Sequence, residues 1–199
     1  YNNFNDEVTM YGSLKDAKIH TSDLSYFSNN IKSYNTLIEI SGEGSGTLRQ
    51  LKGKNTQLRI FESTKFKGDW SLYGLPDFDN TILDFDIQEL ETNYSDLQKI
   101  SLNNVPDNFK TLGPIVYNGN FSGFYNDFIA YGKIKTELGD FDADINIKFK
   151  DGLDKGVYSG QLNSNHFKLK SFISFAPVDD ISFKLALNGT GLSAESFDL

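Results

Sequence analysis

Three aspartates in the second half of the chain have the spacing of metal ligands. Asp140, Asp142 and Asp144 follow the Asp-x-Asp-x-Asp pattern that opens a calcium-binding EF-hand loop. The sixth position of that loop is Ile145, where a glycine is needed for the turn, and the twelfth is Asp151, where a glutamate normally binds calcium. The segment also alternates between polar and apolar residues, as a strand does. We therefore expect no metal site here.

Other residues that could do chemistry are few. The glycine-rich run at residues 42–46 lacks the Lys and Ser/Thr of a phosphate-binding P-loop and the spacing of a dinucleotide site. His20 and His166 are the only histidines and there is no cysteine, so a nucleophile with its base, or a histidine metal site, would be hard to assemble. Asp84 and Asp86 could act as paired carboxylates, but acidic residues on a wet strand face are usually solvated. We expect no enzymatic activity and no cofactor.

The composition indicates one structural unit and argues against nucleic acid as a partner. The 199 residues are 38% hydrophobic and 14% aromatic, and no shift in composition divides them, so we expect one structural unit over residues 1–199. The net charge of −8 repels phosphate backbones and no cluster of Lys and Arg offsets it, so nucleic acid is not an expected partner. No apolar run approaches the roughly 18 residues of a membrane-spanning helix.

The clearest structural signal is a strict alternation from Phe141 to Phe149. The odd positions carry Phe, Ala, Ile, Ile and Phe, and the even positions carry Asp, Asp, Asn and Lys. Successive side chains of a strand point to opposite faces, so this segment has one apolar and one wet face. Residues 128–134 repeat the pattern, and residues 138–140 between them are typical of a hairpin connection. We expect an amphipathic β-hairpin.

The same alternation recurs along the chain and predicts further strands. Together they predict an all-β fold: a curved, mostly antiparallel sheet with one apolar face. The residues that we expect on this inner face are Ile38, Ile40, Leu58, Ile60, Phe66, Trp70, Leu72, Leu83, Phe85, Ile87, Phe128, Ile134, Phe141, Ala143, Ile145, Ile147, Phe149, Phe183, Leu185 and Leu187.

Glycines and one short helix interrupt this pattern. Gly42, Gly44 and Gly46 lie in phase with the apolar face of their strand, which predicts bulges and sharp inward curvature. Similar runs at residues 116–124 and 185–192 indicate a loosely repeated unit, so we interpret the chain as a segment of a longer array. Asn93 or Ser95 could cap one or two helical turns over residues 94–100.

Periodicity alone leaves the architecture open. The apolar faces could close on each other as a β-sandwich, which alternation by itself favours, or they could line an open groove. A surface sandwich of the adhesin or carbohydrate-binding type would present exposed aromatic residues on a wet platform. The candidates for such a platform are Tyr117, Tyr125, Tyr131 and Tyr158.

The order of several short motifs carries a family resemblance. After the glycine-rich strand at residues 38–48 come residues 74–77 (GLPD), 85–88 (FDIQ), 90–92 (LET), 94–97 (YSDL), 118–123 (NGNFSG) and 126–128 (NDF). In this order they resemble TamB-family proteins of the Bacteroidetes type, part of the AsmA-like group. The resemblance covers roughly residues 38–199.

The resemblance implies a fold and a function. Proteins of this family have a β-taco, which is a sheet folded into a U-shaped apolar groove that carries phospholipid between the inner and outer membranes. It implies a periplasmic location, phospholipid acyl chains as the ligand, a role in outer-membrane protein assembly, and an Omp85-family barrel of the TamA type as partner. The full-length proteins are anchored in the inner membrane, so the resemblance implies that membrane contact is made only through parts of the protein outside this segment, in which we expect no anchor helix.

Overall fold

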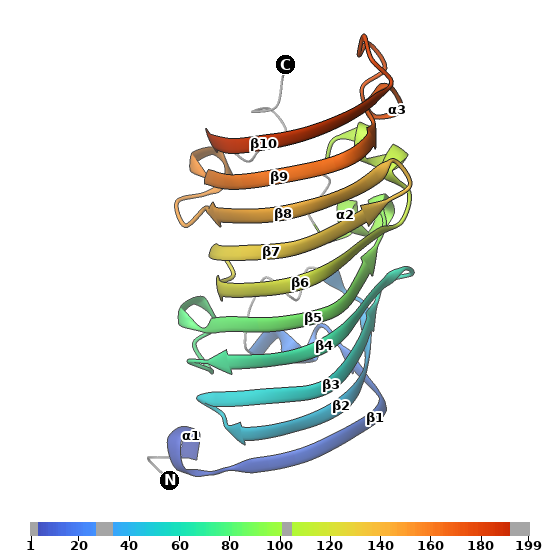
Figure 1. Ribbon diagram of the computed structural model, residues 1–199. Helices are drawn as coiled ribbons and strands as arrows, with labels where there is room; N and C mark the ends of the chain where they lie inside the picture. Colours follow the sequence, from blue (N-terminus) through green and yellow to red (C-terminus); the bar gives the residue numbers. More distant parts are fainter. Residues whose placement is uncertain (1–3, 27–33, 101–104, 192–199) are drawn as a thin grey trace. The chain divides into compact units, whose positions relative to one another are not determined.

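The computed structural model describes residues 4–26, 34–100 and 105–191, and it confirms the all-β fold. Ten strands form one antiparallel sheet in which each strand pairs with the next along the chain (Figure 1). The strands are β1 (Met10–His20), β2 (Leu37–Thr47), β3 (Gln50–Ile60), β4 (Thr64–Tyr73), β5 (Ile82–Thr92), β6 (Ile115–Phe124), β7 (Asp127–Thr136), β8 (Gly139–Lys148), β9 (Val157–Lys168) and β10 (Asp180–Thr190). A sandwich would need two facing sheets, and the described strands belong to one.

Short helices connect some of the strands, and they exceed the one or two turns that the sequence predicted. They are α1 (Phe4–Glu7), α2 (Tyr94–Ile100) and α3 (Leu169–Phe172), with 3-10 turns η1 (Asp23–Tyr26), η3 (Phe78–Asn80), η4 (Asp107–Leu112) and η5 (Leu153–Lys155). The helix predicted at residues 94–100 is α2. Its cap is Asn93, whose side-chain oxygen accepts the backbone N–H of Asp96 at 2.9 Å.

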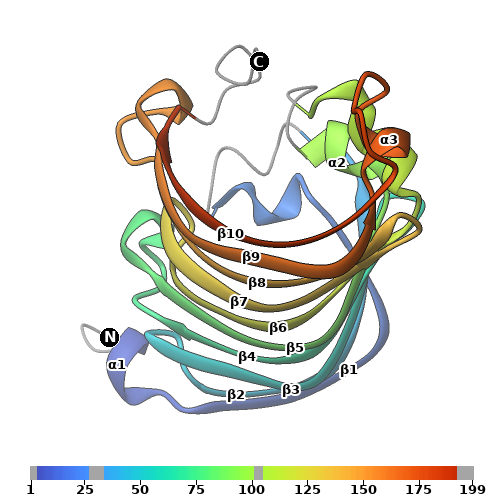
Figure 2. The same ribbon diagram turned by 45° about the horizontal axis from the view of Figure 1, so that its top comes forward.

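The contacts divide the chain into two compact units. The first comprises residues 1–90 and 120–125, and the second residues 91–119 and 126–199, in both cases as far as they are described. The first unit therefore contains β1 to β4 and most of β5, and the second contains β7 to β10. Strand β6 contributes to both. Within each unit the strands curve along their length (Figure 2).

In the second unit the register confirms the predicted alternation. Residues that pair directly across antiparallel strands share a face. Three such rows cross β7, β8, β9 and β10: Phe128–Ile147–Tyr158–Gly189, Ala130–Ile145–Gly160–Leu187 and Gly132–Ala143–Leu162–Leu185. Along β8 the intervening residues, Asp142, Asp144 and Asn146, are all exposed. The predicted apolar face of β8 is therefore on one side of the sheet and its carboxylates are on the other.

The opposite face is polar and carries ion pairs between adjacent strands. Lys133 lies 3.8 Å from Asp142, and Lys148 lies 3.4 Å from Asp127, each pair directly opposite in the ladder. Exposed pairs of this kind each contribute at most about 1 kcal/mol. Within the described ranges, no group of three or more His, Asp or Glu side chains could hold a metal ion.

In the first unit, glycines allow bulges and close packing of the backbone. Gly42 has φ of 146°, and a Cβ there would lie 2.9 Å from the Thr56 Cα, so only glycine fits beside the register shift between β2 and β3. Gly53 pairs directly with Trp70 on β4, and the indole lies over it while donating its Nε1–H to the Thr56 hydroxyl at 2.9 Å. The predicted curvature thus has a local cause. Of the similar glycine-containing runs predicted from the sequence, the one at residues 185–192 ends at Leu192, which lies outside the described residues.

A carboxylate stabilises the bulge of β3. Asn55 has φ of 50°, and its N–H donates to Asp69 Oδ1 at 2.8 Å, while the ammonium of Lys54 donates to Asp69 Oδ2 at 2.6 Å. The hydrogen bond from Lys54 and then that from Asn55 lower the pKa of Asp69 below its ordinary value of 3.8. Ionisation of Asp69 therefore stabilises the folded state.

Gly53→Ala is expected to destabilise the chain by about 1–3 kcal/mol, because the new Cβ would lie 2.1 Å from the Trp70 ring and displace it. Trp70 is the only tryptophan, so its emission should shift as the indole loses its place and its hydrogen bond. The matched control is Gly12→Ala, where nothing lies within 4 Å of the added carbon. Urea unfolding and fluorescence measure both effects, and equal stability of the two variants would contradict the packing.

Asp69→Asn is expected to lower the urea midpoint at neutral pH and to lose this effect in acid. The folded pKa of Asp69 lies below the unfolded pKa, so its contribution is complete above the unfolded value and disappears as the pH falls through the folded value. The difference between variant and parent should therefore shrink as the pH falls below the ordinary value of 3.8 and vanish once the pH is below the folded pKa. Asp142→Asn, which removes the exposed 3.8 Å pair with Lys133, is the control and should change little at either pH.

Candidate functional site

The second unit has an apolar hollow of about 750 Å³. One side is the apolar face of the sheet, and the other consists of residues from α2, η4 and α3, which lie near one end of the strands (Figure 2). Its lining is aliphatic and aromatic except for Thr136 and Lys184. The other lining residues are Leu97, Phe109, Leu112, Ile115, Ile134, Phe141, Ile145, Leu162, Phe167, Leu169, Phe172, Ile173, Ile181, Phe183 and Leu185.

A tightly packed cluster closes the hollow at the helical end. Leu112, Leu138 and Phe167 are buried and form its centre. Around them the rings are in contact: Phe141 and Phe172 lie 4.9 Å and 5.7 Å from Phe167, centroid to centroid. This cluster is the hydrophobic core of the second unit, and it fixes η4 and α3 against the sheet.

Away from the cluster the same face of the sheet is open. Ile145, Ile147 and Leu187 are only half-buried, and Leu185 remains 47% exposed although it lines the hollow. A closed core would bury such residues almost completely. A continuous apolar surface that residues 105–191 leave uncovered is typical of a binding face.

Helix α2 contains an ion pair with a buried carboxylate and a half-buried lysine. Asp96 is fully buried, and Lys99 one turn later donates to its carboxylate at 3.2 Å. Leu97, between them, lines the hollow. Both residues belong to α2, so the pair stabilises the helix that carries Leu97, and a buried carboxylate that lost this partner would be strongly unfavourable.

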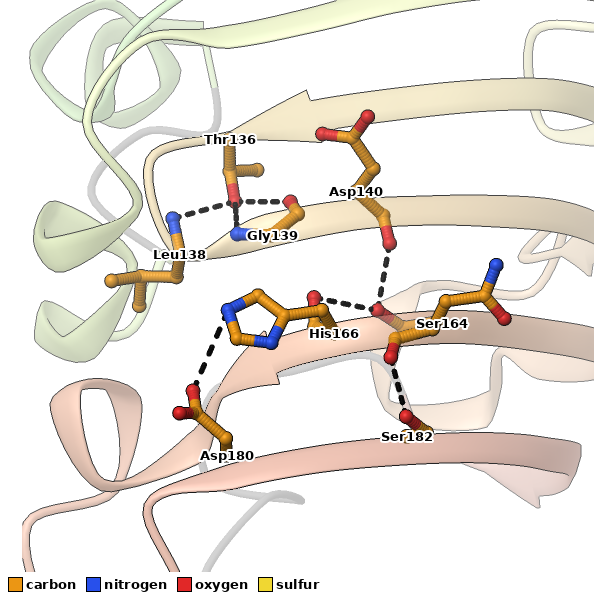
Figure 3. A network of polar contacts seen from close by, with 9 residues as sticks. Thr136, Leu138, Gly139, Asp140, Ser164, His166, Asp180 and Ser182 are labelled. Carbon is orange, nitrogen blue, oxygen red and sulfur yellow. Dashed lines mark hydrogen bonds and ion pairs between the residues drawn. The ribbon is translucent and has the colours of Figure 1, made fainter.

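Polar contacts fix the register where α3 leaves the sheet (Figure 3). The ladder shifts by one residue in β9 between Ser164 and Phe167, and the buried Ser164 hydroxyl donates to the Asp140 carbonyl at 2.7 Å. His166 lies beside Asp180 at 3.5 Å, and Ser182 donates to the Asn165 carbonyl (Figure 3). These bonds hold the bulge and with it the starts of α3 and β10.

Five of the residues predicted for the inner face line this hollow: Ile134, Phe141, Ile145, Phe183 and Leu185. Ala143, Phe128, Ile147 and Leu187 belong to the same apolar rows, and Phe149 follows β8 directly. The sequence did not identify the helical wall or Phe167. The bulge in β9 puts both Ser164 and Phe167 on the buried side, which breaks the alternation that a sequence pattern would detect.

The first unit has a smaller hollow of about 300 Å³. Of the predicted residues, Ile40 and Trp70 line it. Leu83 and Ile87 are buried, whereas Ile38, Leu58, Ile60, Phe66, Leu72 and Phe85 are half-buried. Phe85 contacts Phe66 and Phe121 edge to face, with both centroid distances 5.9 Å, so an aromatic row runs across the strands of this unit.

The tyrosines considered for a wet platform do not share a surface within the second unit. Tyr131 is exposed and pairs with Asp144 on the polar face, whereas Tyr158 lies in an apolar row opposite Gly189. Tyr117 covers Gly132, and its hydroxyl donates to the Tyr131 carbonyl at 3.0 Å. Burial raises the pKa of Tyr117, as expected for a phenol on the apolar side.

Comparison with protein-family models, with curated proteins and with solved structures found no match for this chain. In the part of the chain that the structure describes, no helix has the length and apolarity to cross a membrane.

Two leucine substitutions distinguish an open apolar face from a closed core. Leu138→Ala removes a residue from the buried cluster and should cost about 2–5 kcal/mol of unfolding free energy. Leu185→Ala makes the same chemical change in the open wall and should cost less than about 1 kcal/mol, because the side chain is already partly wet. Urea unfolding measures both. If the two costs were equal, the face would be closed in solution.

Proposed function

We propose that this chain is a non-catalytic segment of a lipid conduit that binds phospholipid acyl chains along the apolar face of its sheet. One observation carries the proposal: the apolar hollow of about 750 Å³ continues into rows of half-buried aliphatic side chains on an open sheet. Its volume lies within the range of about 300–1,000 Å³ that is usual for pockets that bind small molecules.

The chemistry of this face suits hydrocarbon tails. Burying each methylene contributes about 0.8 kcal/mol, so a few carbons of a chain provide useful affinity. The rows contain Ile, Leu, Ala, Phe and Gly, with Tyr158 at one end, and they offer few polar groups that would fix a ligand at one position. A wall of this kind holds a tail while letting it slide along the strand direction or from row to row.

Headgroup recognition is expected to be weak. Lys184 is the only charged residue that lines the larger hollow, and the chain carries a net charge of −8. Binding should therefore depend on the tails and change little with ionic strength.

From the resemblance to TamB-family proteins we also propose a location, a role and a partner for the whole protein. The whole protein would act in the periplasm, anchored in the inner membrane, and carry phospholipid for outer-membrane biogenesis with a role in outer-membrane protein assembly. Its partner would be an Omp85-family barrel of the TamA type. The motifs at residues 74–77, 85–88 and 118–123 carry this part of the proposal.

Ile145→Asp tests the proposal directly. It puts a carboxylate in the wall of the hollow, where contact with a hydrocarbon chain would cost several kcal/mol, while the half-open face lets the charge stay hydrated in the empty protein. We expect circular dichroism to remain that of the parent and co-purified phospholipid, measured by extraction and mass spectrometry, to fall strongly.

The matched control is Asn146→Asp, which introduces the same carboxylate one residue further along β8 on the exposed polar face. It should retain phospholipid as the parent does. A parent that carries no phospholipid, or equal retention by the two variants, would rule out the conduit.

A further inference from the structure

The connection from β9 to β10, which we call the strap (residues 169–179), is a compact loop with a fixed shape. Its ends are joined because the Leu169 N–H donates to the Asp179 carbonyl at 2.7 Å. Inside it, Ile173 donates to the Leu169 carbonyl at 2.7 Å and Ala176 donates to the Ile173 carbonyl at 2.9 Å, and Ala176 is buried. Closed surface loops packed by their own side chains are frequently functional.

The strap has two apolar sides. Leu169, Phe172 and Ile173 line the hollow of the second unit, and Phe172 contacts Phe167 in its buried cluster. Past this turn, Phe175 is 81% exposed and Val178 is 48% exposed. The tight turn buries Ala176 and leaves the neighbouring Phe175 ring exposed to water. The ring therefore adds little to the packing of the folded chain.

We propose that the strap is a contact site for a phospholipid bilayer, into which Phe175 and Val178 insert beside the hollow. This deepens the proposed function and rests on it, because the contact would let acyl chains pass between a membrane and the apolar face. The strap is the one described element that both lines the larger hollow and presents a phenylalanine more than four-fifths exposed.

Size and charge favour a bilayer over a protein partner. A stable protein interface buries about 800 Å² on each partner, whereas one phenylalanine supplies only about 150–250 Å² and Val178 less. Aromatic side chains on a projecting loop are, in contrast, sufficient for a shallow and reversible lipid contact. The charges nearest in sequence, those of Lys168, Lys170, Asp179 and Asp180, sum to zero, which suits a zwitterionic surface.

Flotation with phosphatidylcholine vesicles tests the contact on the complete 199-residue chain. The parent should float with the vesicles, and Phe175→Ala should lower its partition about tenfold, because the apolar contact of one ring is lost. The control Tyr131→Ala removes a ring that is 54% exposed on the polar face of β7 and should leave the partition unchanged. In Phe175→Trp, vesicles should shift the emission to the blue by more than they shift the emission of Trp70 in the parent.

Binding of a monomeric short-chain phosphatidylcholine separates this inference from the proposed function. Phe175→Ala should keep that binding and lose flotation, whereas Ile145→Asp should lose the binding and keep flotation. A parent that never floats, equal flotation of Phe175→Ala and parent, or an equal loss in Tyr131→Ala would overturn the membrane contact. So would a change of oligomeric state in Phe175→Ala without lipid, because the patch would then bind protein. If Ile145→Asp kept the short-chain binding as Phe175→Ala does, the proposed function alone would be overturned.

Discussion

The register of the backbone ladder determines everything else in this chain. Each strand is antiparallel to the next, so the direct pairing of residues such as Ile145 with Ala130 and Gly160 puts one set of side chains on one face. A slip of one residue would exchange the two faces and put Asp142 and Asp144 where Ala143 and Ile145 now lie. Hydrogen bonds at the strand ends, such as that from Ser164 to Asp140, therefore specify the chemistry of a whole face as well as the position of one turn.

The apolar face is tightly packed at one end of the strands and open along the rest of their length, and the open part is available to a ligand. In the second unit, the cluster of Leu112, Leu138 and Phe167 supplies a packed core at one end of the strands. Further along, glycines alternate with large side chains, and rings such as that of Tyr158 fold over the space above Gly189. Elements that are packed at one end and open along their length can stay folded while leaving apolar surface for a ligand.

The sequence predicted what depends on a strand's own residues. The alternation in β8 was enough to assign its faces, and the two cap candidates, Asn93 and Ser95, were enough to indicate a short helix over residues 94–100, where the structure has α2 capped by Asn93. The strap, η4 and Phe167 were not predicted, because their positions depend on partners. The bulge of β9 changes the phase between Ser164 and Phe167, and α3 packs only because Phe109 and Phe167 surround Phe172. For the same reason the sequence identified the open wall of the hollow and missed its closed end.

The most direct measurement of the central claim is photocrosslinking from alternate positions of β10 in the presence of phospholipid. A photoreactive amino acid is introduced one position at a time at residues 182, 183, 185, 186 and 187, which lie on the apolar or the polar face of the strand. We expect lipid adducts at positions 183, 185 and 187 and none at 182 and 186; position 184 is left out because Lys184 lines the hollow. Adducts that are absent, or equally frequent at odd and even positions, would contradict binding along one face of the sheet.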